Sequence, residues 1–271
     1  MAISLAWAFL PKSHIMKIIG IIPARMASTR FPGKPLADIV GMPMIGHCYF
    51  RSRMCSSLDE VYVATCDKEI FDYMESIGGR AVMTADTHER ATDRTAEAVA
   101  KIEEVTGEAI DLVVMLQGDE PMVVPEMLEQ AIRPMLADPT LQILNIIARI
   151  PDRELFESPN TVKLVLGVGG NILYLSRSPI PSDAKYKGEI PMLKQLGIIL
   201  FRRDFLFEYN SMPQTPYEVI ESCDMLRVVE NGIRLQTVLT DVDTWSVDTP
   251  QDLALVVEKM GTDPLVKTYV K

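Results

Sequence analysis

Three cations stand close together in the stretch from residue 21 to residue 36, IIPARMASTRFPGKPL. Arg25, Arg30 and Lys34 are interleaved there with small residues, although the 271-residue chain has a net charge of −10. The apolar residues 18–22 before them predict a buried parallel strand. Backbone N–H groups and cations in a loop after such a strand can surround a phosphate group. A solvated basic loop is the alternative, but α/β proteins bind ligands at the carboxyl ends of strands, which favours phosphate binding.

Carboxylates in two other segments could hold a metal ion. The apolar strand predicted from residue 111 runs into QGDEP, with Asp119 and Glu120, and Asp248 stands in SVDTPQDL just before a helix. Neighbouring acids are costly to keep charged unless a cation neutralises them. Mg²⁺ takes few protein carboxylates and completes its shell with phosphate oxygens and water. A helix N-cap is the alternative for either aspartate, but together with the cationic loop the pair favours a site for Mg²⁺ and a nucleotide.

The motif PARMASTRFPGKPL matches, at every fixed position, the signature PAR-x-x-STR-x-PGKPL of the 3-deoxy-manno-octulosonate (Kdo) cytidylyltransferases, which it closely resembles. QGDEP and VDTPxDL resemble two further motifs of that family, and the resemblance covers about residues 16 to 260. It implies that CTP is bound through its triphosphate and that Asp119 and Asp248 bind Mg²⁺, with Glu120 orienting the loop. The triphosphate contacts that it implies are Arg25, Ser28, Arg30 and Lys34. Arg25, Lys34 and Asp119 are the residues expected to act in catalysis.

A fourth segment, THERATDRTAE at residues 87–97, resembles the family pattern H-x-SGTDR-x-AE. In the family this loop lies beside the base and ribose, so Thr92 and Arg94 are expected to contact the nucleotide, together with Gln117 of QGDEP. Arg90 and Ala91 replace the Ser and Gly of the pattern. We expect His88 to be a structural histidine rather than a catalytic one.

The resemblance is weakest where the family binds its sugar acid. QLGIILF stands for HxGIYxY, and EVIESCDMLR for E-x-x-E-x-LEQLR, so that Gln195, Ile199 and Met225 replace His, Tyr and Gln. A site that loses hydrogen-bonding groups loses discrimination. Kdo is therefore expected to be a poor acceptor, and a related acid a better one. The residues assigned to the acceptor pocket by the resemblance are Arg177, Gln195, Glu218, Glu221 and Met225.

Hydrophobic periodicity predicts an α/β fold with a doubly wound, mostly parallel sheet and a small β-hairpin extension. The resemblance implies the GT-A-like nucleotidyltransferase version of this fold. Strands are expected at 17–24, 60–66, 80–85, 111–119, 141–150, 194–203 and 232–240, and helices at 43–54, 67–78, 92–105, 124–136, 215–231 and 249–260. A hairpin is expected at 161–181, with its turn at 167–171.

The chain is expected to hold one nucleotidyltransferase domain, residues 16–260. Residues 155–200 would form a β extension on the acceptor side, which the resemblance makes part of a homodimer interface. Residues 1–15 are expected to be an extension outside the fold, with a weak signal anchor as the alternative, and residues 261–271 a C-terminal tail. The apolar residues 2–10 are too short to span a membrane.

Composition narrows the classes of protein further. With 48% hydrophobic and 24% charged residues the chain suits a globular protein with a large core, and its acidity disfavours nonspecific nucleic-acid binding. Four cysteines without CxxC spacing are expected to be thiols of a cytoplasmic protein, and three scattered histidines make zinc unlikely to be bound.

These observations favour an enzyme that transfers CMP from CTP to an acidic sugar, Kdo or a related 2-keto-3-deoxy acid, and releases pyrophosphate. The resemblance connects this activity to nucleotide-sugar and lipopolysaccharide biosynthesis. Two alternatives stay open. One is a nucleotidyltransferase for another anion, such as an amino-sugar acid or a phosphonate. The other is a non-catalytic nucleotide-binding protein, which the intact phosphate loop and both metal carboxylates make less favourable.

Overall fold

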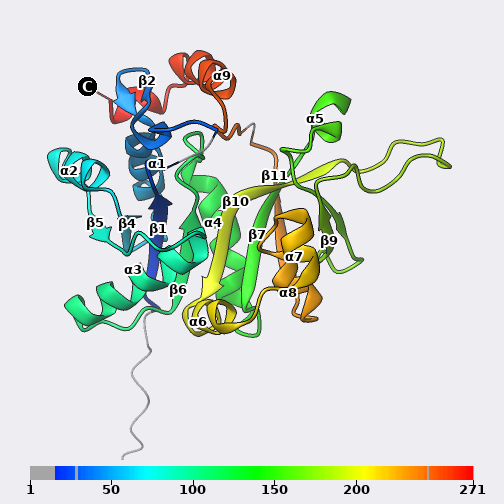
Figure 1. Ribbon diagram of the computed structural model, residues 1–271, viewed down its shortest axis with the longest axis horizontal. Helices are drawn as coiled ribbons and strands as arrows, with labels where there is room; N and C mark the ends of the chain where they lie inside the picture. Colours follow the sequence, from blue (N-terminus) through cyan, green and yellow to red (C-terminus); the bar gives the residue numbers. More distant parts are fainter. Residues whose placement is uncertain (1–15, 28–29, 243, 271) are drawn as a thin grey trace, which may run out of the picture.

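The computed structural model describes residues 16–27, 30–242 and 244–270, so that the expected extension 1–15 lies outside the described residues. Its main sheet has the strand order β11-β7-β10-β6-β1-β4-β5 (Figure 1). The strands are β1 (Ile18–Ala24), β4 (Glu60–Thr65), β5 (Ala81–Met83), β6 (Leu112–Leu116), β7 (Ile143–Arg149), β10 (Leu193–Arg202) and β11 (Leu235–Thr240). β10 is antiparallel to both of its neighbours, whereas the other pairs along this order are parallel. The predicted mostly parallel α/β sheet is confirmed.

Each central strand contributes side chains to two cores, because successive residues of a strand point to opposite faces. In β1, Ile18 and Ile22 belong to one core, and Ile19 and Ile21 belong to the other. Helices cover both faces, as a doubly wound sheet requires. The first core takes side chains from α1 (Met44–Arg53), α2 (Lys68–Ser76), α4 (Pro125–Ala137) and α9 (Pro250–Gly261). The second takes them from α3 (Ala91–Thr106), α6 (Arg203–Ser211) and α8 (Leu226–Glu230).

The predicted hairpin is formed by β8 (Lys163–Leu166) and β9 (Ile172–Ser176). Its turn lies where the sequence placed it, with the N–H of Gly167 donating to Asn171 O at 2.8 Å. The extension ends earlier than residue 200, because β10 begins at Leu193 and is already a strand of the main sheet. A short helix that the sequence did not indicate, α5 (Arg153–Glu157), precedes the hairpin, and the chain between β9 and β10 projects from the body (Figure 1).

The prediction of one helix at residues 215–231 is wrong, because this segment forms two short helices, α7 (Pro216–Glu221) and α8. Ser222 ends α7 in the left-handed conformation, with φ +48°, which is uncommon for a residue other than glycine. Helix α6 was not predicted either. Both errors lie on the same side of the molecule, where α6, α7 and α8 surround polar side chains that are described below.

The C-terminal residues are packed rather than forming a free tail. Val266, in the 3₁₀ turn Val266–Thr268, is 4% exposed and joins the first core, and Tyr269 OH bonds His47 Nδ1 at 2.8 Å. Arg51 on α1, 1% exposed, donates to Asp263 Oδ2 at 2.7 Å and to Val123 O at 2.6 Å. These contacts fix the segment after α9 against α1. Among the described residues, no helix combines the length and the apolar character needed to span a bilayer.

The Arg51–Asp263 pair gives a test of this packing. Asp263→Asn should lower the free energy of unfolding by about 1.5–3 kcal/mol, the usual worth of a hydrogen bond to a charged group, because it leaves a buried guanidinium without its counter-ion. Urea unfolding at neutral pH measures the change. Asp204→Asn, whose side chain is 92% exposed beside Arg203, is the matched control and should unfold like the parent. Identical curves for both variants would contradict a packed C-terminus.

Candidate active site

A cleft of about 730 Å³ opens at the edge of the sheet where the parallel strands β1 and β6 end. Most of the predicted nucleotide and metal residues line it. Thr92, which is 1% exposed, is not among the lining residues. Ser28 lies outside the described residues. The predicted residues that line the cleft are Arg25, Arg30, Lys34, Arg94, Gln117, Asp119 and Asp248.

Backbone hydrogen bonds hold the predicted phosphate loop in place after β1. Met26 N–H donates to Asp67 Oδ2 at 2.7 Å, just beyond the end of β4. Gly33 then turns the chain with φ +74°, in the left-handed region that only glycine enters without strain, and its N–H returns to Met26 O at 3.1 Å. The short 3₁₀ helix Lys34–Leu36 follows, with Pro35 buried. The loop therefore closes on itself and directs Lys34 across the cleft.

Lys34 is the centre of the charged site. Its Nζ donates to Asp119 Oδ2 at 2.8 Å and to Val247 O at 2.7 Å, and lies 3.5 Å from Asp248 Oδ1. Arg30 donates to the same Asp248 oxygen at 2.9 Å. The side chain of Lys34 is only 12% exposed, so its attraction to the two carboxylates is less screened than at the surface. One ammonium group thus holds together three segments that are distant in the sequence.

The two aspartates fit a metal ion that arrives with a nucleotide. Asp119 and Asp248 approach one common cation, Lys34 Nζ, and a backbone bond from Val247 N–H to Asp119 O at 2.9 Å fixes their loops to each other. Over the described ranges, no group of three or more His, Cys, Asp or Glu side chains could hold a metal by itself. Two carboxylates that need phosphate oxygens and water to complete the shell suit Mg²⁺ better than a metal in an all-protein cage.

Glu120 lies behind the site and ties its loop to β10. It is 5% exposed, and its Oε1 accepts from Gly197 N–H at 3.0 Å, while Gln117 N–H donates to Gly197 O at 2.8 Å. Burial, reinforced by the neighbouring charge of Asp119, raises the pKa of Glu120 to about 7. Glu120 therefore has the loop-orienting position that the sequence predicts for it.

Gly118 explains a different constraint in QGDEP. A Cβ at this position would lie 3.1 Å from Pro23 O and 3.3 Å from Ile45 Cδ1. Any larger residue would press the QGDEP loop a few tenths of an ångström away from the end of β1, so glycine favours this close packing. The close approach brings the loop that carries Asp119 next to the loop that carries Lys34.

Arg94 and His88 shape the rim of the cleft. Arg94 is 3% exposed and donates to Thr84 Oγ1, to Ala85 O at 3.3 Å and to His88 O at 3.4 Å. The His88 ring bonds Glu97. Although burial opposes the shift, hydrogen bonds from Lys101, the Ala85 N–H and His88 lower the pKa of Glu97 to about 2. His88 thus makes a structural hydrogen bond from the cleft wall, and Arg94 fixes the chain around it.

None of the five residues assigned to the acceptor pocket lines this cleft. The guanidinium of Arg177 donates hydrogen bonds to three backbone carbonyls, those of Glu221 at 2.7 Å, Pro159 at 2.9 Å and Ser222 at 3.0 Å. Glu221 in turn accepts from Ser176 Oγ and from Arg177 N–H, both at 2.8 Å. These two residues join α7 to the hairpin.

The apolar substitutions at the acceptor side are core residues. Met225 is 1% exposed, Ile199 is 3% exposed, and both belong to the second core. Glu218 is fully buried, and Gln195 is partly exposed with its Nε2 donating to Asn145 Oδ1 at 2.8 Å. The argument that Ile199 and Met225 would face sugar hydroxyls is therefore wrong, and it gives no reason to expect Kdo to be a poor acceptor.

Two groups at the cleft escaped the sequence analysis. The Val247 carbonyl, a Lys34 partner, is a backbone atom and carries no sequence signal. Arg90 lines the cleft and forms ion pairs with Glu218 and Asp224, far along the chain. Its only signal in the sequence is that it departs from the SGTDR pattern.

A doubly wound sheet with a cationic loop and two facing carboxylates at its carboxyl edge defines a nucleotide-binding enzyme of the nucleotidyltransferase class. The family model for Cytidylyltransferase matches residues 19–237. A 3-deoxy-manno-octulosonate cytidylyltransferase of Geobacter metallireducens is 43% identical over 256 residues, which cover 91% of this chain and 98% of the relative. One of Solibacter usitatus is 38% identical and covers 89% and 93%. The chain belongs to the 3-deoxy-manno-octulosonate cytidylyltransferase family, as its motifs predict.

Solved structures agree with this assignment. The structure of CMP:2-keto-3-deoxy-manno-octonic acid synthetase complexed with CTP has a TM-score of 0.82 and 37% identity, over 90% of this chain and 98% of that one. A cytidylyltransferase from Leptospira borgpetersenii has a TM-score of 0.60 at 17% identity, covering 93% and 97%, and shares the fold alone.

Glu120 gives a pH-dependent test of the site. Its folded pKa of about 7 lies above the ordinary value of 4.5, so its protonated form favours folding, and this contribution is lost as the pH rises through about 7. Glu120→Gln still offers Gly197 N–H an acceptor and has no charge to bury. Without nucleotide or divalent cation, its free energy of unfolding relative to the parent should therefore rise from about pH 5 to about pH 8. Exposed Glu258, changed to Gln, is the control. A difference that stays flat with pH would refute the raised pKa.

Proposed function

We propose that the protein transfers CMP from CTP to 3-deoxy-manno-octulosonate and releases pyrophosphate. One observation carries the proposal: Lys34 bridges Asp119 and Asp248 inside a cleft large enough for a nucleotide. Support for the substrates comes from relatives, since the enzyme of Geobacter metallireducens is named for this acceptor and the related solved structure is a complex with CTP.

The triphosphate of CTP would replace Asp119 and Asp248 as the partner of the cationic side chains Lys34 and Arg30. Arg25 and Arg30 are exposed on the loop, and Lys34 reaches the floor of the cleft. Phosphate oxygens that bind Lys34 and Arg30 would free Asp119 and Asp248 to bind a metal ion. Lys34 and the two arginines would also stabilise the negative charge of the departing pyrophosphate, the kind of electrostatic contribution that dominates phosphoryl transfer.

Asp119 and Asp248 would hold Mg²⁺, which when bound polarises phosphate oxygens and lowers the pKa of a coordinated hydroxyl. A hydroxyl of the sugar acid gives up its proton to solvent and its oxygen attacks the α-phosphorus in line, while the bond from that phosphorus to the bridging oxygen of pyrophosphate breaks. Asp119 and Lys34 are placed by backbone bonds and by each other, so the chain's main contribution is positioning. Gln117 and Arg94 would contact the nucleoside from the cleft wall. Thr92, being buried, would support Arg94 from α3.

We place the acceptor beside the first residues of β10. The register of β10 against β7 shifts between Gln195 and Ile199. Gly197, which lies in this irregular stretch, accepts a hydrogen bond from Gln117 N–H and donates one to Glu120 Oε1. Gln195 is partly exposed there and can accept and donate hydrogen bonds. Arg177 and Glu221 would shape this side by joining α7 to β9. Glu218 and Met225 would support it from buried positions.

Two broader properties complete the proposal. A homodimer is supported by large apolar side chains that stay exposed on α7 and β9, among them Tyr217 at 51%, Ile220 at 74% and Leu173 at 54%. A protein interface would cover such side chains. A cytoplasmic location is supported by four free cysteines, three of them buried.

Pyrophosphate release tests the substrates. With Mg²⁺ and CTP, Kdo should give the highest kcat/KM in a panel that includes its deoxy analogues, an amino-sugar acid and a phosphonate.

CTP should also raise Tm more than ATP or GTP at equal concentration, because only a bound nucleotide stabilises the native state. Equal thermal shifts for all three nucleotides would remove the cytidine assignment. A better turnover of another acid would keep the transferase and change the acceptor.

Lys34→Ala should lower kcat by about 10²–10³-fold, because it removes a fixed cation from the developing charge. Asp119→Asn and Asp248→Asn should each abolish Mg²⁺-dependent turnover while far-UV circular dichroism stays unchanged. Lys68→Ala is the control, since that side chain is 82% exposed on α2, outside the cleft. If Lys34→Ala and Lys68→Ala have the same kinetics, the loop is only a solvated basic turn.

A further inference from the structure

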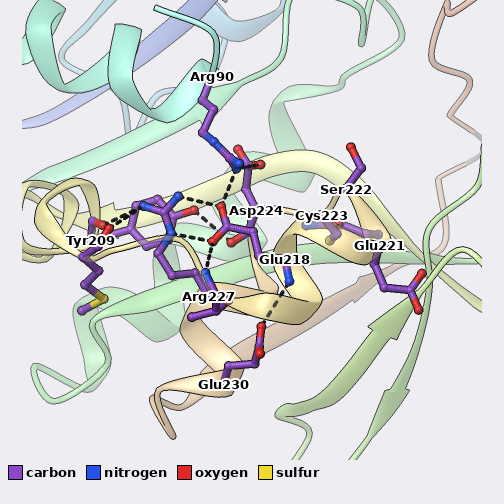
Figure 2. A network of polar contacts seen from close by, with 12 residues as sticks. Arg90, Tyr209, Glu218, Glu221, Ser222, Cys223, Asp224, Arg227 and Glu230 are labelled. Carbon is purple, nitrogen blue, oxygen red and sulfur yellow. Dashed lines mark hydrogen bonds and ion pairs between the residues drawn. The ribbon is translucent and has the colours of Figure 1, made fainter.

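Arg90 connects the nucleotide cleft to a different part of the molecule. It is the residue before α3, its side chain does not cap the helix, and it lines the cleft. Its Nη1 lies 2.5 Å from Glu218 Oε1 and also contacts Asp224 Oδ1. Figure 2 shows the side chain reaching from the loop before α3 to the segment formed by α7 and α8. We call the contacts of Arg90 with Glu218 and Asp224 the Arg90 bridge.

The guanidinium has all of its edges occupied. With the amide oxygen of Gln214 facing Arg90, that oxygen accepts from Nη2 at 2.6 Å and from Nε at 3.2 Å. Arg90 therefore meets carboxylates on one nitrogen and an amide on the other two. This arrangement fixes the direction of the side chain, which a single ion pair between flexible residues does not do.

The far side of the Arg90 bridge is rigid. Glu218 is fully buried and accepts a two-pronged contact from Arg227, at 2.8 Å to Nε and 2.6 Å to Nη2. Arg227 also donates to Tyr209 O and Met212 O, both at 3.2 Å, and its guanidinium lies 4.6 Å from the Tyr209 ring centre. Burial raises the pKa of Asp224 although Arg90 opposes the shift. The positive charge of Arg90 thus stabilises the charged form of Asp224, which burial disfavours.

On the cleft side of the bridge, Arg90 holds one end of the segment that lines the cleft. Arg94 and Glu97 already fix the chain at Ala85 and His88. Arg90 anchors the other end of that cleft-lining segment. On the opposite side, α7 continues through Glu221 to Ser176 of the hairpin. Polar contacts therefore join the nucleotide cleft to one end of α7 and join the other end of α7 to β9, and the helix backbone connects the two.

We propose that Arg90 is a positioning residue that couples nucleotide binding to the α7–α8 segment on the acceptor side. When a nucleotide fixes the cleft segment 85–91, the Arg90 bridge stabilises residues 216–230, none of which lines the cleft. By linkage, a stable α7–α8 segment in turn favours the nucleotide-bound cleft. The proposal rests on the proposed function in one respect, that CTP is the nucleotide.

Hydrogen exchange with and without CTP and Mg²⁺ tests the coupling. In the parent, CTP should slow exchange in residues 30–36, 85–91 and 216–230. In Arg90→Gln, the slowing should persist at 30–36 and be lost at 216–230, and KM for the acceptor should rise about tenfold with a smaller change in kcat. Arg90→Lys, which keeps the charge and loses the contact with Gln214, should restore part of the effect. Arg203→Gln, which breaks an ion pair between α6 and Glu103 of α3, is the matched control and should behave like the parent.

Asp224→Asn tests the bridge from the other side if Arg90→Gln folds poorly. It should weaken the coupling less than Arg90→Gln does, because Arg90 keeps Glu218, and the double variant should be no worse than Arg90→Gln alone. CTP-dependent protection of residues 216–230 that survives in Arg90→Gln would overturn the proposal while the nucleotide assignment stands. A parent protein in which CTP protects none of the three segments would overturn both.

Discussion

The site depends on one ammonium group held between two carboxylates. Lys34 could not reach Asp119 and Asp248 unless three loops from separate strands met at the same edge of the sheet. The parallel order of β1 and β6, the close approach at Gly118 and the left-handed turn at Gly33 all contribute to that meeting. In a partly buried position the attraction is strong enough to hold the loops, yet each partner is a group that phosphate or metal can replace. The same contact therefore organises the cleft, and a phosphate or a metal ion can replace either partner in it.

The residues that line the cleft were mostly predictable because they stand in short motifs. Residue type and spacing in the segment from Arg25 to Lys34 already specify cations after a buried strand, and QGDEP places acids after another. The alternating apolar pattern specified the strands for the same reason, since each strand buries both of its faces. What the sequence could not give is the pairing of Lys34 with both aspartates, which arises only when the sheet order is known.

The acceptor half was predicted less well, for physical reasons that are specific to its residues. Ser222 breaks a helix whose apolar periodicity continues past it, and no glycine or proline marks the break. Ile199 and Met225 differ from the family pattern, but they fill the core, so their difference says nothing about hydrogen bonds to a sugar. The contacts of Arg90 join positions that are more than a hundred residues apart, and only the folded chain brings them together.

The reversed direction of β10 has a consequence for how such enzymes can diversify. Because β10 is antiparallel to β6 and β7, its beginning, rather than its end, lies at the edge where those strands finish. In the proposed arrangement, the nucleotide is bound by segments that leave the sheet, and the acceptor lies beside a segment that enters it, after the projecting chain at residues 177–192 (Figure 1). Insertions or deletions in that incoming segment would not change the register of β1 or β6. If the acceptor lies where we propose, lineages can alter the choice of sugar through this segment while the residues that transfer the cytidylyl group are inherited unchanged.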